Sequence, residues 1–265
     1  VGVLRGDRPG PTYLLRADMD ALPVQEDTGL PFASEVPGVM HACGHDTHVA
    51  MLLGAARLLA ERRDELAGQV VFMAQPGEEG FHGARYMLEE GLLDAVPEAP
   101  VVGAFALHVF ANQPSGVVSV RPGPMMAAAD HWEVPVRGRG GHASMPHAAA
   151  DPVPVAAEIV LALQSMVTRR APVFDPAVVT VANLVAGSTD NVIPDTAYLQ
   201  GTIRTLSPER RADVVASVRR VATHVAAAHD MEIDFVHRQG YPVTANDPAV
   251  ADRVLAIAGE LVGPE

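Results

Sequence analysis

The 265-residue sequence has a single cysteine, Cys43. One cysteine cannot form a disulfide within the chain, which excludes the small disulfide-stapled folds that are typical of secreted domains. Hydrophobic residues make up 48% of the chain and charged residues 19%, ordinary values for a globular protein that buries a core. The chain is long enough for two domains.

Positive charge is scarce. The sequence has 19 lysines and arginines against 32 aspartates and glutamates, a net charge of -13 with no basic run, so a nucleic-acid-binding surface is not expected. No apolar run approaches the roughly 18 residues that a membrane-spanning helix needs, and no signal-peptide pattern opens the chain. These absences favour a soluble, cytoplasmic protein that binds neither nucleic acid nor membrane.

The two ends of the sequence read as interrupted elements. Residue 1 is a valine, and "VGVLRGDRPGPTYLLRAD" at residues 1–18 predicts a β-hairpin that is entered partway. "DPAVADRVLAIAGELVGPE" at residues 247–265 predicts a helix without an ending signal. We therefore expect a fragment that lacks both ends of a longer protein.

The first part of the chain, residues 1–117, alternates strand-like and helix-like segments. The segment at 47–66 has a strong helical stripe, which Asp46 or Thr47 is expected to cap. Such alternation predicts an α/β sheet with helices on its faces. The remaining segments are "TYLLRADMD", "QVVFMAQPGEEG", "GARYMLEEGLL" and "PVVGAFALHVF".

The middle part, residues 118–240, has a different order of predicted strands and helices. Its segments predict the order β-α-β-β-α-β, the ferredoxin-like split unit, which forms a compact module by itself. Ser207 and Pro208 predict the start of its second helix. Residues 241–265 would then return the chain to the first domain.

Polar side chains follow the predicted strands of the first part, where an open α/β sheet binds ligands. Thiolate, imidazole and carboxylate are the ligands that first-row divalent metals use, so together they predict a metal site. The candidates are Arg16, Asp18, Asp20, Cys43, His45, Glu78, Glu79 and His108.

Each candidate also has a plainer interpretation. A lone cysteine is more often a small buried hydrophobe, and His108 after an apolar run could be a core histidine. Glu78 and Glu79 could form a solvated turn. His41 and His48, beside the "CGH" turn, are expected to be bystanders, caps or partners of the ligands rather than ligands.

The adjacent glutamates, Glu78 and Glu79, could have different roles: one carboxylate would bind metal and the other would stay free. A divalent metal lowers the pKa of water far below about 15.7, and a free carboxylate can take the proton. This pattern predicts metal-assisted hydrolysis, with an amide as the expected substrate.

Several motifs, in order along nearly the whole chain, resemble the amidohydrolase branch of the aminoacylase/carboxypeptidase dimetal peptidase family, which includes hippurate and indoleacetyl-amino-acid hydrolases. The resemblance implies a zinc-exopeptidase-like catalytic domain with an inserted ferredoxin-like lid that also mediates homodimerisation. The motifs are "RADMDALPVQE", "HACGHDTHVAMLLGAA", "QPGEEG", "ALHV", "GRGGHASMPH", "DPV", "NVIPD" and "GTIRT".

The resemblance also implies roles for single residues. It implies Glu78 as general base and acid, and His142 of the lid as the residue that stabilises the oxyanion. Asn191 and Arg204 match positions that hold the carbonyl and the carboxylate of the substrate, and a guanidinium suits a carboxylate. The implied metal ligands are Cys43, His45, Glu79 and His108.

Without the resemblance, three of these residues have other interpretations. His142 could be a turn residue, Asn191 a turn former before Pro194, and Arg204 the partner of an acid in the same domain. The family also carries one more metal-binding histidine in a C-terminal segment, whereas the last histidine here is His237.

The expected function is therefore hydrolysis of N-acyl amino acids with two divalent metals. Zinc or manganese is expected first, with cobalt or nickel as alternatives. Open alternatives are a deacetylase, carbamoylase or dipeptidase of the same family, and a metal-binding module without catalysis. A single structural zinc is disfavoured because such sites are closed by four ligands.

Overall fold

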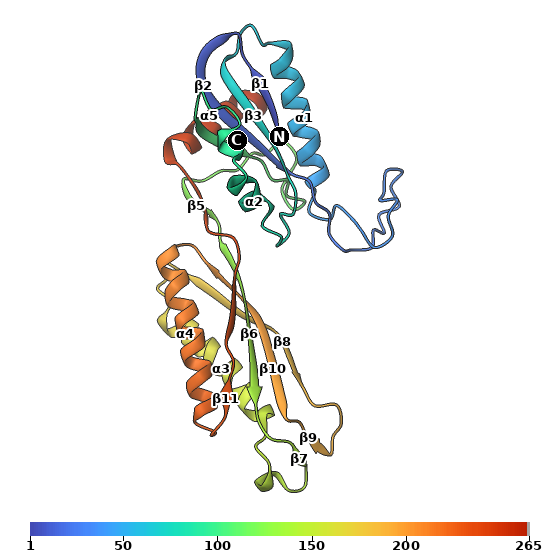
Figure 1. The fold of residues 1–265 in the computed structure, drawn as a ribbon, viewed down its shortest axis with the longest axis vertical. Coiled ribbons are helices and arrows are strands. Elements are labelled where there is room, and N and C mark those ends of the chain that lie inside the picture. The colour runs from blue at the N-terminus through green and yellow to red at the C-terminus, as the bar shows by residue number, and fades with distance from the viewer. Residues whose placement is uncertain (264–265) are drawn as a thin grey trace. The chain divides into compact units, whose positions relative to one another are not determined.

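The computed structural model describes residues 1–263, and the chain forms two compact units with a mixed α/β fold (Figure 1). The first unit is Val1–Ser115, and the second begins at Gly116. None of the helices in the described residues is long and apolar enough to cross a membrane.

The first unit is built on a four-stranded sheet in the order β1-β3-β2-β4. Strand β2 runs parallel to both β3 and β4, and β1 runs antiparallel to β3. The carboxyl ends of β2, β3 and β4 therefore share one edge of the sheet. The elements are β1 (Gly2–Arg5), β2 (Arg8–Asp18), α1 (His45–Glu61), β3 (Ala67–Gln75), α2 (Gly83–Glu89), the short 3-10 helix η1 (Leu92–Asp94) and β4 (Val101–Ala106).

The prediction of a hairpin at residues 1–18 is wrong. Strands β1 and β2 do run in opposite directions, but β3 lies between them and pairs with both. The backbone N–H of Gly6, in the connection, donates to Gly68 O of the incoming strand at 2.9 Å. Strand β3, which lies 62 residues further along the chain at the Gly6–Gly68 contact, thus takes the place that a local pair would fill.

The apolar core of the first unit is small. Helix α1 packs along the sheet, yet its only buried residues are His45 and His48. Much of the buried interior near the strand ends is therefore polar. The buried apolar cluster consists of Leu14, Val71, Met73, Leu92 and Val96.

The second unit is built on an antiparallel sheet in the order β11-β6-β10-β8, and β12 continues the β11 edge along β6. From β6 onward the main elements follow one another as β-α-β-β-α-β. The elements are β5 (Gly123–Met126), β6 (Ala128–Arg137), β7 (Gly141–His142), η2 (Pro146–Ala148), α3 (Pro152–Arg170), β8 (Ala177–Ala186), β9 (Val192–Ile193), β10 (Thr196–Thr205), α4 (Pro208–Ala227), β11 (Glu232–Ile233), β12 (Val236–Gln239), β13 (Thr244–Asn246) and α5 (Pro248–Val262).

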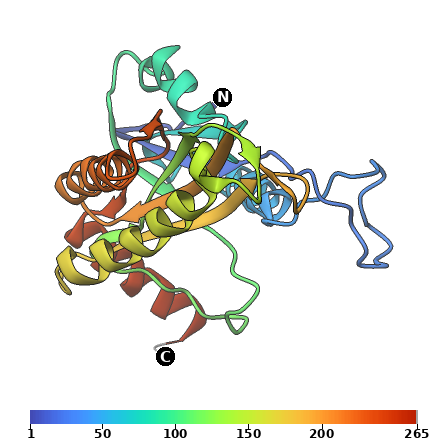
Figure 2. The same cartoon turned by 90° about the horizontal axis from the view of Figure 1, so that it is seen from below.

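Helices α3 and α4 lie side by side on one face of this sheet (Figure 1 and Figure 2). Their apolar faces and the inward-facing side chains of β6, β8 and β10 form one core, so this unit has a continuous hydrophobic interior. Its buried members are Trp132, Val134, Val136, Val155, Ala156, Ile159, Leu163, Met166, Val179, Ala197, Leu199, Ile203, Val214, Val218, Ala222, Ala226 and Met231.

Three helices of the second unit begin with the same local chemistry. The side chains of Asp151, Ser207 and Asp247 accept hydrogen bonds from backbone N–H groups of the first turn, and a proline follows each of them. Proline fits the first helical position because no intrahelical partner exists there for its missing N–H. The predicted start of α4 at Ser207 is therefore confirmed.

Gly201 explains how the only tryptophan fits into the core. A Cβ at Gly201 would lie 2.6 Å from Cζ2 of Trp132 and 2.0 Å from the carbonyl oxygen of Thr180. Only glycine leaves room for the indole ring on this strand, and Trp132 is fully buried against β10.

Candidate metal centre

Chemically active side chains gather at the carboxyl-terminal edge of the first sheet. Asp18 ends β2, Glu78 and Glu79 follow β3, and His108 follows β4. The amino-terminal end of α1 brings His45 to the same edge, where its Nε2 lies 3.7 Å from Asp18 Oδ2. The parallel pairing of the strands is therefore what assembles residues from four separate segments.

Gly44 shapes the turn between Cys43 and His45. It has a left-handed backbone with φ of 79°, and a Cβ there would lie 2.5 Å from Cγ2 of Val109. The expected cap at Asp46 or Thr47 is wrong, because α1 is entered through Gly44 without a side-chain cap. The two donors consequently flank a glycine that no larger residue can replace without a clash.

The predicted ligands lie close enough to share metal ions. One ligand atom from each of Cys43, His45 and His108 lies within 4.8 Å of the others, and the same holds for His45, Glu78 and Glu79. The Sγ of Cys43 lies 3.5 Å from Nε2 of His108. His45 belongs to both groups, so the groups are contiguous.

The imidazole of His45 is oriented with one nitrogen available. Its Nδ1 lies 2.9 Å from the backbone oxygen of Asp20 and 3.2 Å from its Oδ1, so Nδ1 carries the proton and donates. The Nε2 is buried without a hydrogen-bond partner and lies 3.9 Å from Oε1 of Glu79. A buried nitrogen lone pair without a donor costs free energy, and a cation would satisfy it.

His48 has both nitrogens occupied. Its Nε2 accepts the N–H of Val109 at 3.0 Å, which fixes the proton on Nδ1, and Nδ1 donates to Oδ1 of Asp18 at 2.5 Å. His48 therefore has no lone pair for a metal, although it lies beside His45 and Asp18. It instead ties α1 to the backbone directly after His108.

Burial and the negative charge of Glu79 disfavour ionisation of the neighbouring Glu78 carboxyl group and Cys43 thiol. Burial and then the Glu79 carboxylate raise the pKa of Glu78. Burial and the charge of Glu79 also raise the pKa of the Cys43 thiol, to about 11. Burial opposes ionisation of Asp20, but the backbone N–H groups of Glu79 and Glu78 outweigh it and lower the pKa of Asp20.

The donor set fits divalent cations. A thiol, imidazole nitrogens and carboxylate oxygens are the groups that zinc and neighbouring first-row metals bind. The unsatisfied Nε2 of His45 and the crowded negative charge around Glu79 are both relieved by a cation. The groups that could hold it contain the predicted ligands Cys43, His45, Glu79 and His108, together with Glu78.

The other three predicted site residues belong to the second unit. His142 lies on β7, Asn191 immediately precedes β9, and these short strands pair with each other. The N–H of Ala143 donates to the backbone oxygen of Asn191 at 3.1 Å, so the structure brings His142 and Asn191 to one hairpin-like loop. Arg204 is exposed on a separate element, β10, opposite Ala129 of β6.

Asp20 and His48 make more contacts with the candidate ligands than the sequence pattern indicates. Asp20 binds Nδ1 of His45 and also accepts the N–H of Glu79 at 2.9 Å, so it fixes two candidate ligands at once. The available signal was the spacing of His45 and His48, which places both on one face of a helix. The identity of their partners depends on strand pairing across the sheet.

The chain matches one protein-family model and is similar to several known proteins. The family model described as peptidase family M20/M25/M40 matches residues 14–265. N-acetylcysteine deacetylase of Bacillus subtilis is 43% identical over 247 residues, covering 93% of this chain and 64% of the relative. Thermostable carboxypeptidase 1 of Saccharolobus solfataricus is 41% identical over 265 residues, covering 98% of this chain and 66% of the relative.

A solved structure supports the same assignment. The crystal structure of the Bacillus subtilis YXEP protein, described as a dinuclear metal binding peptidase from the M20 family, has a TM-score of 0.80 and 39% identity. The match covers 98% of this chain and 65% of that one. The chain thus spans slightly less than two thirds of the length of these relatives. On the family match and these similarities, the chain belongs to peptidase family M20/M25/M40.

Proposed function

We propose that this chain provides the catalytic centre of a metal-dependent hydrolase that splits the amide bond of N-acyl amino acids, releasing a carboxylic acid and an amino acid. The observation that carries the proposal is the contiguous donor cluster at the sheet edge, with the Glu78 carboxylate beside the Glu79 carboxylate. Relatives named as an N-acetylcysteine deacetylase, an IAA-amino acid hydrolase and an N-acyl-L-amino acid amidohydrolase support the substrate class.

In this proposal Cys43, His45, Glu79 and His108 hold two divalent cations. The thiol favours zinc, whereas the carboxylate and imidazole donors also accept manganese, cobalt or nickel. Such cations make water more acidic and polarise a carbonyl group. Asp20 and His48 keep the ligands in place through the imidazole of His45 and the backbone after His108.

Glu78 is the proposed general base and acid. Its raised pKa gives it more affinity for a proton than an ordinary glutamate has, which suits a group that takes a proton from water. The same carboxyl group then returns the proton to the leaving nitrogen, so its charge is restored at the end of the reaction.

The second unit is proposed to act as the inserted ferredoxin-like lid. His142 would stabilise the oxyanion, Asn191 would hold the carbonyl of the substrate, and Arg204 would bind its carboxylate. The exposed guanidinium of Arg204 suits a bidentate pair with a carboxylate. The free edge of β8, where Val178 and Val185 are exposed, suits pairing with a second copy, and a doubled mass in sedimentation equilibrium is expected.

A matched pair of variants tests the proposal. Glu78→Gln in the full protein should lower turnover of N-acetyl and N-benzoyl amino acids by about 10²–10⁴-fold, the range for a general base or acid, while metal content stays unchanged. Glu79→Gln should lower the metal content itself. Turnover close to wild type in Glu78→Gln would remove Glu78 from this role.

A dipeptidase or carboxypeptidase activity is the second candidate, favoured by the relative named as a thermostable carboxypeptidase. Dipeptides measured beside N-acetyl and N-benzoyl amino acids separate the two. Faster turnover of dipeptides would replace the proposed substrate class. Metal binding without turnover of any of these substrates would favour a non-catalytic metal-binding module.

A further inference from the structure

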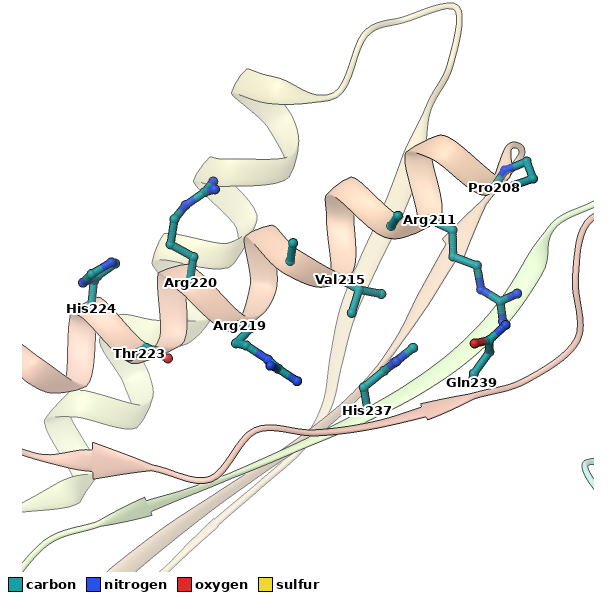
Figure 3. A pocket seen from close by; sticks show the side chains of 11 residues that line it. Pro208, Arg211, Val215, Arg219, Arg220, Thr223, His224, His237 and Gln239 are labelled. Carbon is teal, nitrogen blue, oxygen red and sulfur yellow. The ribbon is translucent and has the colours of Figure 1, made fainter.

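A groove in the second unit lies between α4 and the edge strand β12 (Figure 3). Its volume of about 660 Å³ falls within the range of small-molecule sites. None of the residues proposed for catalysis or metal binding lines it. The lining consists of Pro208, Arg211, Ala212, Val215, Ala216, Arg219, Arg220, Thr223, His224, His237 and Gln239.

The floor of the groove is apolar because α4 carries small side chains there. Ala212, Val215 and Ala216 follow the three- and four-residue spacing of one helix face. The core-facing residues of the same helix, such as Val218, are different ones and are fully buried. The space between helix and strand is therefore bordered by small side chains, of which Val215 also packs against the edge of the core.

The groove is positively charged within an acidic protein. Its lining has three arginines and two histidines and no aspartate or glutamate, whereas the whole chain has 32 acidic and 19 basic side chains. This contrast favours an anionic ligand at the part of the groove away from Asp130, whose carboxylate pairs with Arg211 at one end.

The positive charge of Arg211 is neutralised by a carboxylate of the same unit. Its Nε and Nη2 donate to the two carboxylate oxygens of Asp130 at 2.7 and 2.6 Å, and Nη2 also donates to the backbone oxygen of Gly240. This buried pair forms one end of the groove and holds α4 to β6. It contributes structure and no net charge.

The charge of Arg219 has no such partner. The contact described for its guanidinium is with the ring of Phe235, 5.1 Å from the centroid, and no carboxylate lies within ion-pair distance among the described residues. Stacking on a ring leaves the in-plane N–H donors free for a second group. Arg219 extends from α4 toward β12, whereas the ring of His237 points toward the Arg211 end of the groove (Figure 3).

His237 supplies the opposite wall. The alternation of β12 places His237 and Gln239 on the helix side of the strand, and both line the groove. Nε2 of His237 lies 3.2 Å from Oδ1 of Asp130 but is buried without a hydrogen-bond partner.

We propose that this groove binds a small organic anion that has one carboxylate and an apolar group. The carboxylate binds the guanidinium of Arg219, and the apolar group lies on Ala212, Val215 and Ala216. A guanidinium recognises a planar carboxylate through paired hydrogen bonds, and the apolar floor excludes fully polar anions. The site is separate from the proposed reaction and does not depend on it.

Octanoate is a suitable probe, with octanol as its uncharged analogue. Calorimetric titration of the metal-free chain should show octanoate binding, and octanol should bind more weakly. Arg219→Gln should weaken octanoate binding by about tenfold or more, the loss expected for a hydrogen bond to a charged group. Ala216→Phe should block binding by filling the floor.

Arg169→Gln is the matched control, because Arg169 is also an exposed arginine on a helix of this unit but lies on α3 outside the groove. Its octanoate affinity should equal that of wild type, and all variants should keep the wild-type circular dichroism spectrum. Equal losses in Arg219→Gln and Arg169→Gln would overturn the proposal. So would octanol binding as tightly as octanoate, no octanoate binding up to about 10 mM, or binding of polyglutamate without octanoate.

Discussion

The two units differ in what surrounds their buried charged groups, although each unit also has buried polar atoms without a hydrogen-bond partner. In the second unit Asp130 is buried, and Arg211, Gly240 and a neighbouring histidine surround it within a large apolar core. In the first unit the apolar cluster is small, and Nε2 of His45 is buried without a partner. The Arg211–Asp130 pair contributes stability to the second unit, whereas the unpartnered His45 nitrogen of the first unit lies among carboxylates, where a cation would satisfy it.

Loss of the buried Arg211–Asp130 pair of the second unit should give the largest change in the free energy of unfolding. Arg211→Met leaves Asp130 buried without its partner and should lower the free energy of unfolding by about 3–5 kcal/mol, measured by urea denaturation. Metal affinity should not change, because the cluster belongs to the first unit. Arg137→Met is the control: Arg137 pairs with Asp234 on the surface, and its loss should cost about 0–1 kcal/mol.

The same pair predicts a pH dependence. Burial opposes ionisation of Asp130, but hydrogen bonds from Arg211 and Gly240 outweigh it, so the pKa of Asp130 is lowered. A lowered carboxyl pKa contributes stability that is present above the unfolded value of about 3.9 and is lost as the pH falls through the folded value. Arg211→Met should therefore differ most from wild type near neutral pH and least in acid. A constant difference between neutral pH and acid would contradict this account.

In the first unit, the contribution of His48 to the candidate metal cluster can be tested. His48→Ala removes the link to Val109 and Asp18, so His108 is no longer held, and divalent-cation affinity should fall by about 10–100-fold in calorimetric titration. His41→Ala, an exposed histidine of the same motif, should leave the affinity unchanged. His48→Gln, which keeps an acceptor for the Val109 N–H, should recover part of the loss. Equal affinities in His48→Ala and His41→Ala would show that His48 does not position the ligands.

The smallest expected change in stability comes from the residues at the start of helices α3 and α1. Asp151→Ala removes a side-chain cap from α3 and should cost about 1 kcal/mol in thermal denaturation. Asp46→Ala in α1 removes only the favourable charge in the first turn, about 0.3 kcal/mol, because α1 begins at Gly44 without a side-chain cap. A larger loss for Asp46→Ala would reverse the contrast.

Local patterns predicted much of the element order. The buried strand at 69–75, the helix after Gly44 and the Ser207 start of α4 follow from apolar periodicity and capping chemistry that neighbouring residues determine. The donor residues of the first unit could also be predicted to share one edge, because parallel strands point their carboxyl ends the same way.

Other features depend on contacts between distant segments. The first two strands have the turn and direction of a hairpin, but the pairing of β3 between them is decided by packing of the whole sheet. The start of α1 depends on the close approach of Val109 to Gly44, which is 65 residues away in sequence. The partners of His48 likewise come from distant segments, the end of β2 and the loop after β4, so the sequence could suggest a supporting role but not the bonds themselves.

The packing of Trp132 against Gly201 has a practical consequence. Because Trp132 is the only tryptophan and is fully buried, intrinsic indole fluorescence reports the opening of the second unit and is silent for the first. Fluorescence and backbone ellipticity should coincide during denaturation only if both units unfold together. A separation of the two curves would therefore resolve the stability of the metal-binding unit from that of its neighbour without any introduced label.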